Sequence, residues 1–251
     1  MPPGAMVGGV VKDGVAAAAA MRQLLARTEI SDQRAFVAVN DALATFRILH
    51  LPRNASSEDV EVMVAREMPI DPERLVTRWV DLAMENESRV VYAAAWDRTN
   101  LRTVTDAVRS IGIEPVVVEL KSASIARAVV EPAAVVVDLS SEPAEIVLID
   151  RYLPQVWHNA TLAHGDDLGS TLSPAIRSVM RFYRRRRDVD FPRSSPVLLS
   201  GEQVFTDDQL RQLGQDLGQP VMPLPAPPRV PGHIRHTTYL ACLGLIMRRT
   251  A

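Results

Sequence analysis

The stretch VVVDLSSEPAEIVLID, residues 135–150, decides the fold that the sequence predicts. Its first part is a short apolar run rich in β-branched residues, which is typical of a buried strand, and this run ends at Asp138. Residues 140–143 are typical of a turn, and the apolar residues of 144–150 predict a second strand. We therefore expect two antiparallel strands joined by a tight turn, with a carboxylate placed where the turn begins.

The composition is that of an ordinary globular protein. The chain has 251 residues, of which 47% are hydrophobic and 23% are charged, and this length allows one large domain or two lobes. A net charge of −2 gives no general attraction to nucleic acid or to anionic lipid. The single cysteine, Cys242, cannot form an internal disulfide, which favours a reducing compartment. No apolar run reaches the ~20 residues of a membrane-spanning helix, so we expect a soluble, cytoplasmic protein.

Cap and turn residues divide the rest of the chain into alternating helices and strands. Asp13, Ser56 and Thr206 stand where helices are expected to begin, and Gly112, at a C′ position, and Gly218 stand where helices are expected to end. The expected helices cover residues 14–27, 56–68, 99–112, 122–130, 168–187, 207–217 and about 236–248. The expected strands cover residues 35–40, 44–51, 74–96 as a pair, 114–120, 133–139, 144–150, 151–162 and 196–200. Six prolines in residues 220–232 predict an extended surface segment. This alternation predicts an α/β or mixed fold that divides near residue 132.

The predicted hairpin resembles one that is found in the actin-like ATPases. In that fold each half begins with a hairpin whose first strand ends in Asp-x-Gly, with the Asp near the metal and the glycine close to the phosphates. Residues 135–150 resemble the hairpin of the second half. PVLLSGEQ, residues 196–203, resembles the later strand and turn that pack against the nucleoside. The resemblance implies an α/β, actin-like (ribonuclease H-like) fold with two lobes.

Four further stretches resemble one branch of that fold in the right order. They are GGVVKDGVAAAAAMRQLL (8–25), the segment FRILHL…VDL (46–82), the segment VVYAAAW…ARAV (90–129) and YLACLGLIMRR (239–249). Together they resemble the PilM family, the cytoplasmic actin-like component of the type IV pilus assembly platform, which is itself similar to the division protein FtsA. The resemblance implies a first lobe at residues 1–131, with an inserted subdomain at about 43–112, and a second lobe at 132–251.

The departures from the family pattern concern the nucleotide. The chain opens after the family's first hairpin, so we expect the first phosphate hairpin to be missing. We expect the small covering subdomain of the second lobe to be missing or reduced. Ser140 stands where the family has glycine; if it had to adopt the left-handed conformation, the cost would be about 1–2 kcal/mol. The resemblance implies a vestigial nucleotide site made of Asp138, Ser140, Ser141, Ser200, Gly201 and Glu202.

These departures predict a scaffold rather than an enzyme. We expect a pseudo-ATPase with no cofactor, in which ATP and Mg²⁺ would bind only if the pocket were functional. By resemblance, its partner is the N-terminal peptide of a PilN-type inner-membrane protein of a pilus or secretion platform. We therefore expect a protein that is peripheral to the inner membrane only through that partner. We expect no binding to nucleic acid, and self-association is left open. Two alternatives stay open, an active ATP-binding member that uses Asp138, Ser200 and Gly201, and a decayed fragment. Asp138 itself could instead be a turn-initiating residue that accepts a bond from its own backbone.

Two charged segments could either bind a ligand or partner or be ordinary solvated surface. His233 and His236 have a spacing that can bind a metal, but no Cys, Asp or Glu lies near them in the sequence, so we expect solvated histidines. The segment RFYRRRRD, residues 181–188, could contact anionic lipid or an acidic partner. The alternative is a solvated helix end whose cations suit the helix dipole.

Overall fold

The computed structural model of the chain describes residues 4–68, 71, 73–85, 88–140, 142–161, 168–202, 205–228 and 230–248. The chain divides into two compact units, the first made of residues 1–35 with 39–118 and the second of residues 36–38 with 119–251. The division runs through two strands, β3 (Arg34–Val39) and β7 (Glu114–Leu120), which pair in a two-stranded sheet. Each unit has its own hydrophobic core.

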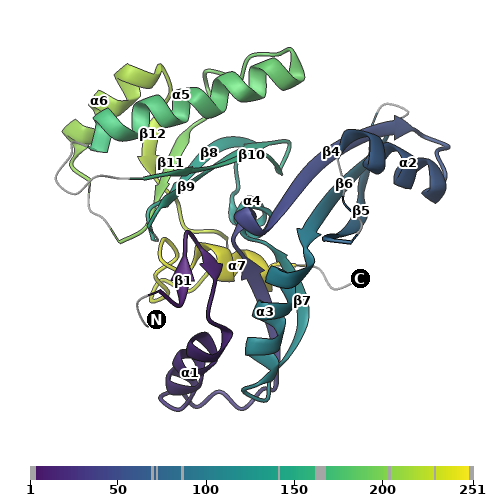
Figure 1. Ribbon diagram of the computed structural model, residues 1–251. Helices are drawn as coiled ribbons and strands as arrows, with labels where there is room; N and C mark the ends of the chain where they lie inside the picture. Colours follow the sequence, from purple (N-terminus) through teal and green to yellow (C-terminus); the bar gives the residue numbers. More distant parts are fainter. Residues whose placement is uncertain are drawn as a thin grey trace. The chain divides into compact units, whose positions relative to one another are not determined.

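The first unit contains a three-stranded antiparallel sheet in the order β4-β6-β5. Its strands are β4 (Ala44–Pro52), β5 (Leu75–Glu85) and β6 (Ser88–Asp97), and helix α2 (Ser57–Glu67) covers one face (Figure 1). The helix begins at the predicted cap residue, Ser56, through a capping box in which the Ser56 side chain accepts from Asp59 N and the Asp59 side chain accepts from Ser56 N. Val60 and Val64 of α2 are buried against Leu49, Leu51 and Val91 of the sheet.

A helix pair and several short segments complete the first unit. Helix α1 (Gly14–Leu25) begins at the predicted cap, Asp13, and packs against α3 (Arg98–Arg109) through small alanine side chains. Strands β1 (Met6–Val7) and β2 (Val10–Val11) form a short hairpin before α1, and the 3-10 turn η1 (Asp41–Leu43) leads into β4. The expectation that Gly112 occupies the C′ position was wrong by one residue. The helix cap is Ser110, so Gly112 lies two residues beyond it, with φ of 83°.

The second unit is built on a five-stranded sheet in the order β10-β9-β8-β11-β12. Its strands are β8 (Ala133–Asp138), β9 (Ala144–Asp150), β10 (Leu153–Ala160), β11 (Val197–Ser200) and β12 (Val221–Pro223). Strands β8, β9 and β10 are antiparallel, whereas β11 lies parallel to both β8 and β12. The hairpin that residues 135–150 predict is therefore confirmed.

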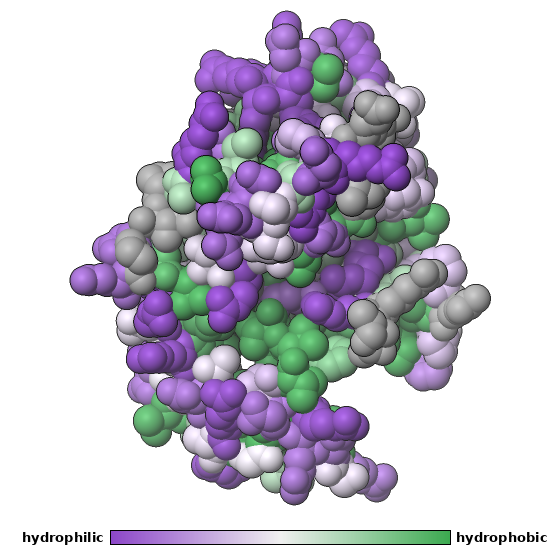
Figure 2. Space-filling model, turned by 90° about the vertical axis from the view of Figure 1, so that its right-hand side faces the viewer, coloured by the Kyte–Doolittle hydropathy of each residue, from purple (hydrophilic) through white to green (hydrophobic). Residues whose placement is uncertain are grey.

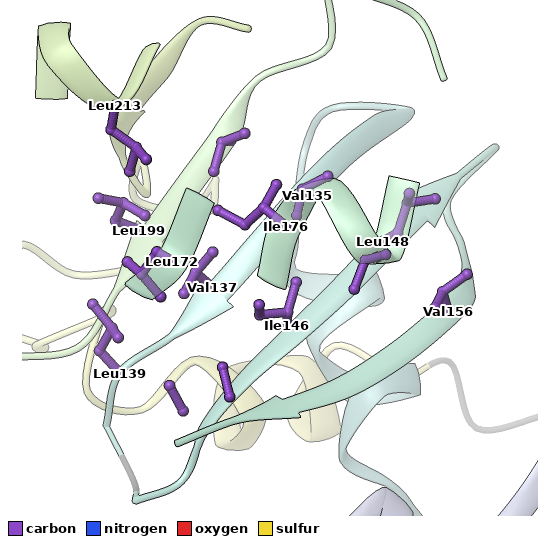
Figure 3. Close-up of a cluster of buried hydrophobic side chains, with 14 of the residues drawn as sticks. Val135, Val137, Leu139, Ile146, Leu148, Val156, Leu172, Ile176, Leu199 and Leu213 are labelled. Atoms are coloured by element: carbon purple, nitrogen blue, oxygen red, sulfur yellow. The ribbon is translucent and has the colours of Figure 1, made fainter. Parts of the chain in front are cut away.

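Helices cover both faces of this sheet because its strands are apolar on both sides. Successive side chains of a strand point to opposite faces. Val135 and Val137 therefore contact one layer and Val136 the other. The first layer contains α5 (Leu168–Arg187) and α6 (Asp207–Leu217), and its core is drawn in Figure 3. The second layer contains α4 (Lys121–Ala128) and α7 (Leu240–Ile246).

Two segments of the second unit differ from the sequence prediction. Part of the proline-rich segment is not simply surface, since β12 pairs with β11 and Leu224 is buried. Pro223 is tolerated there because β12 is the edge strand of the sheet. The closing helix, expected from about residue 236, begins only at Leu240. The preceding residues form turns, and one of them, Thr237, has its carbonyl bound by a side chain of β11.

Helices α4 and α7 pack with almost no space between their backbones. A Cβ added to Gly244 of α7 would collide with the carbonyl oxygen of Ser124 in α4. The same junction holds a buried carboxylate, Glu119, which binds Arg127 in a two-pronged contact at 2.7 and 3.1 Å and binds Arg248 at 2.8 Å. Burial opposes the charge of Glu119, but Arg127, Ser124 and Arg248 outweigh it and hold its pKa below the ordinary value. The last helix is thereby fixed to the sheet through α4.

We predict that Gly244→Ala destabilises the protein. Alanine favours a helix interior over glycine by up to about 1 kcal/mol, but the collision with a backbone carbonyl must separate α4 from α7, and overpacking costs about 1–3 kcal/mol. Chemical denaturation should show a lower midpoint for this variant. Gly232→Ala is the matched control, because a Cβ at Gly232 meets nothing within 4 Å. Equal midpoints for both variants would contradict the close packing.

Candidate functional site

Two buried carboxylates face one another at the end of the central hairpin. Asp138 and Glu145 are direct cross-strand partners on β8 and β9, and they are 2% and 3% exposed. Strand alternation places both on the face that α4 and α7 cover, the face to which Val136 and Val147 also point. Like charges directly opposite on antiparallel strands repel, so this pair needs a cation.

Lys121, the first residue of α4, supplies that cation. Its Nζ lies 2.8 Å from Asp138 Oδ2 and 3.0 Å from Glu145 Oε1. Burial tends to lower the pKa of the ammonium, but the attraction of the two carboxylates outweighs burial, and the pKa is raised above its ordinary value of 10.5. The three side chains therefore form a charged bridge between the helix and the hairpin.

A lysine is unusual at this place in this chain. The sequence contains 28 lysines and arginines, and only two of them, Lys12 and Lys121, are lysines. A lysine ammonium is a compact point charge, whereas a guanidinium is a broad plane with a fixed fork of donors. The compact group fits between two carboxylates that the strand register has already brought together. Lys121 and Glu145 were not recognised in the sequence, although the register of the predicted hairpin would have paired Glu145 with Asp138.

The remaining oxygens of the two carboxylates are also bonded to the protein. Asp138 Oδ1 accepts a hydrogen bond from the backbone N–H of Ser140 at 2.9 Å, and Glu145 Oε2 accepts one from Trp157 Nε1 at 3.4 Å. The turn-initiating interpretation of Asp138 is thus confirmed. Ser140 is not among the described non-glycine residues with positive φ, so the strain considered for it is not incurred.

The turn after β11 packs directly on the turn after β8. Leu139 N donates to the carbonyl of Ser200 at 2.8 Å, and Ser200 Oγ donates to the carbonyl of Thr237 at 2.7 Å. Gly201 has φ of 129°, and a Cβ there would lie 3.0 Å from the backbone carbonyl carbon of Leu139. Glycine is therefore required at position 201 because two turns approach each other closely.

The structure brings Asp138, Ser140, Ser200 and Gly201 together at one end of the sheet. The parallel pairing of β8 with β11 places Asp138 beside Ser200. Glu202 lies nearby on the surface, 3.6 Å from the guanidinium of Arg235. Ser141, the remaining predicted site residue, lies outside the described residues.

The histidine pair takes no part in this site. His236 Nε2 lies 3.0 Å from the carbonyl oxygen of Leu224, and His233 is exposed. Among the described residues, no group of three His, Cys, Asp or Glu side chains is placed to hold a metal ion.

The residues at the hairpin do not fit the magnesium nucleotide that the actin-like resemblance implies. Mg²⁺ needs oxygen ligands at about 2.0–2.1 Å in octahedral geometry. One oxygen of Asp138 already binds the Lys121 ammonium at 2.8 Å and the other binds a backbone N–H. A divalent cation would have to expel a buried positive charge from between two carboxylates.

The fold is similar to those of two solved structures. A chain of the PilM–PilN type IV pilus biogenesis complex matches 98% of this chain and 88% of its own length, with a TM-score of 0.73 and 20% identity. The cytoplasmic domain of EpsL, an inner-membrane component of the type II secretion system of Vibrio cholerae, matches 93% of this chain and 82% of its own, with a TM-score of 0.53 and 11% identity. No protein-family model and no curated protein matches the sequence.

These similarities confirm the predicted actin-like α/β fold and the predicted PilM-like architecture at the level of the fold. None of the helices that the structure describes has the length and apolar character needed to cross a membrane.

We predict that Lys121→Met destabilises the protein by about 3–5 kcal/mol, since removing one member of a buried ion cluster leaves uncompensated charge. Urea denaturation measures the loss, and Lys12→Met, which removes the other and exposed lysine, is the matched control. Lys121→Met combined with Asp138→Asn and Glu145→Gln should recover most of the loss, because no member of this ion cluster then carries a charge. A loss equal to that of Lys12→Met would show that the bridge contributes nothing.

The free energies of unfolding of the same variants should also depend on pH in a defined way. The pKa of Lys121 is raised on folding, so its contribution is complete below the ordinary value of 10.5 and declines as the pH rises through the higher folded value. The stability difference between the wild type and the triple variant should therefore not fall between neutral pH and the ordinary lysine pKa.

Proposed function

We propose that this chain is an actin-fold scaffold that works without ATP on the cytoplasmic side of a pilus or secretion platform. There it would hold the N-terminal peptide of a PilN-type inner-membrane protein, through which it would be peripheral to the membrane. The observation that carries the part concerning ATP is the Lys121 ammonium between Asp138 and Glu145. The part concerning the platform rests on the fold.

The breadth of the fold similarity supports the assignment to such a platform. The matched chain of the PilM–PilN complex covers 98% of this chain, so both units take part in the similarity. The second matched structure is the cytoplasmic domain of an inner-membrane component of a secretion system. One match from a pilus biogenesis complex and one from a secretion system support the proposed role on such a platform.

The closed geometry of the two turns supports the absence of ATP turnover. Phosphate binding requires backbone N–H groups that converge on an open space. Here Ser140 N is bound to Asp138, Leu139 N is bound to Ser200, and Gly201 fills the space next to Leu139. Glu142 adds an exposed negative charge beside the same turn. These contacts favour the scaffold over the ATP-binding alternative.

Peptide binding to such a scaffold has a simple physical basis. An extended peptide gains main-chain hydrogen bonds when it lies along an exposed strand edge, and alternate side chains then enter pockets. The sheet order β4-β6-β5 leaves β5 as an edge strand of the first unit. A peptide partner could therefore bind along this edge strand without any nucleotide.

We predict that the folded chain binds no magnesium nucleotide. Titration calorimetry with ATP and Mg²⁺ should give only the heat of dilution, because the hairpin carries its own cation and its N–H donors are occupied. Circular dichroism of the same sample confirms that it is folded. Saturable, magnesium-dependent heat with one nucleotide per chain would overturn this part of the proposal.

We predict that the full chain retains the N-terminal cytoplasmic peptide of a PilN-type protein from its own organism. Immobilised peptide should retain the protein on a column, whereas a scrambled peptide of equal charge should not. The retained amount should not change when ATP and Mg²⁺ are added. Equal passage through both columns would count against the scaffold assignment and would leave the nucleotide result unaffected.

A further inference from the structure

The outer face of α5 carries a dense group of exposed arginines. The inner side of the helix is buried through Leu172, Ile176, Val179 and Tyr183. Residues three and four positions apart share one side of a helix, so the remaining positions point outward. The arginine face, as we define it, consists of the exposed residues Arg177, Arg181, Phe182, Arg184, Arg185 and Arg186.

An exposed phenylalanine lies within this cationic face. Phe182 is 54% exposed, although its neighbour Tyr183 is almost wholly buried. Tyr152, in the turn between β9 and β10, is 56% exposed. The hydrogen bond of 2.8 Å from Tyr183 Oη to Asp150 Oδ2 holds that turn beside the end of α5. Two exposed aromatic rings therefore accompany the arginines.

The positive charge of the face is local. The whole chain has a net charge of −2, yet the face contains no acidic residue. Asp188 and Asp190 follow the helix, and Asp190 lies 3.3 Å from Arg184 Nε. Arg177 donates a hydrogen bond to the carbonyl oxygen of Asp216 in α6. A helix C-terminus interacts favourably with cations in its last turn only, which does not account for Arg181. The arginines therefore exceed what the helix end itself requires.

We propose that the arginine face adsorbs to an anionic lipid surface. The face is the convex outside of a helix and not a groove, so it suits a planar array of phosphates better than a single peptide. Guanidinium groups bind phosphate oxygens through paired donors, and an exposed ring among them can enter the headgroup region. In Figure 2, the upper part of the molecule, where α5 lies in Figure 1, is mainly hydrophilic with isolated hydrophobic residues.

The adsorption is weak and reversible by itself. A basic side chain near an anionic membrane surface contributes about 1 kcal/mol, and stable anchoring normally needs a second signal. A membrane-bound partner would provide that signal, and the arginine face would then orient the second unit toward the bilayer. The lipid contact does not depend on the peptide partner, so each can fail without the other.

Vesicle sedimentation with the full chain tests this proposal. The protein should sediment with vesicles of phosphatidylcholine and phosphatidylglycerol and stay in solution with phosphatidylcholine alone. Arg181→Gln combined with Arg185→Gln should lower the partition coefficient by about tenfold or more, because two cations leave the surface. Phe182→Ser should lower it without changing its dependence on salt, since no charge is removed.

The control removes the same charge elsewhere. Arg53→Gln combined with Arg102→Gln changes two exposed arginines of the first unit and should leave the partition coefficient unchanged. Raising the salt concentration should release the wild type, because exposed charges are screened. Equal losses in both double variants would overturn the proposal. Absence of sedimentation with anionic vesicles, or binding of a polyglutamate probe without vesicle binding, would do so too.

Discussion

The structure depends on two buried carboxylates that the strand register places opposite each other and on the helix lysine that lies between them. Antiparallel pairing places Asp138 opposite Glu145 on the buried face of the hairpin, where water cannot screen them. The first residue of α4 then brings the Lys121 ammonium within 3.0 Å of both carboxylates. Because the Lys121 ammonium and the N–H groups of Ser140 and Trp157 bind both carboxylates, groups of the chain itself hold this part of the fold together.

The same face of the sheet explains why α4 and α7 belong to the site as well as to the core. Helix α4 supplies the cation at its first residue and packs on α7 along its body, where Gly244 allows close approach. The turn before α7 binds the hydroxyl of Ser200. A hairpin end, a neighbouring turn and two helices are therefore bonded to one another. The polar groups of the two turns are used to hold the fold together.

Much of this could be predicted from the sequence, because the local signals are strong. The β-branched run at residues 133–138, the caps Asp13, Ser56 and Thr206, and the left-handed Gly218 all fix local structure through interactions within a few residues. The PilM-like fold was expected from the resemblance of four ordered stretches of the sequence to that family. The bridge could not be predicted, because Lys121 lies in the helix before the hairpin and meets its partners only through packing. The edge strand β12 was not predicted, because its prolines indicated an extended surface segment and its parallel pairing partner, β11, is distant in the sequence.

The decisive measurement is a crystal structure of the protein grown with magnesium and a non-hydrolysable ATP analogue. The account predicts Lys121 Nζ between Asp138 and Glu145, with the turn after β8 still closed on Gly201 and no nucleotide beside it. A lysine displaced from the carboxylates, with a metal ion next to Asp138 and phosphates against the opened turns, would contradict it.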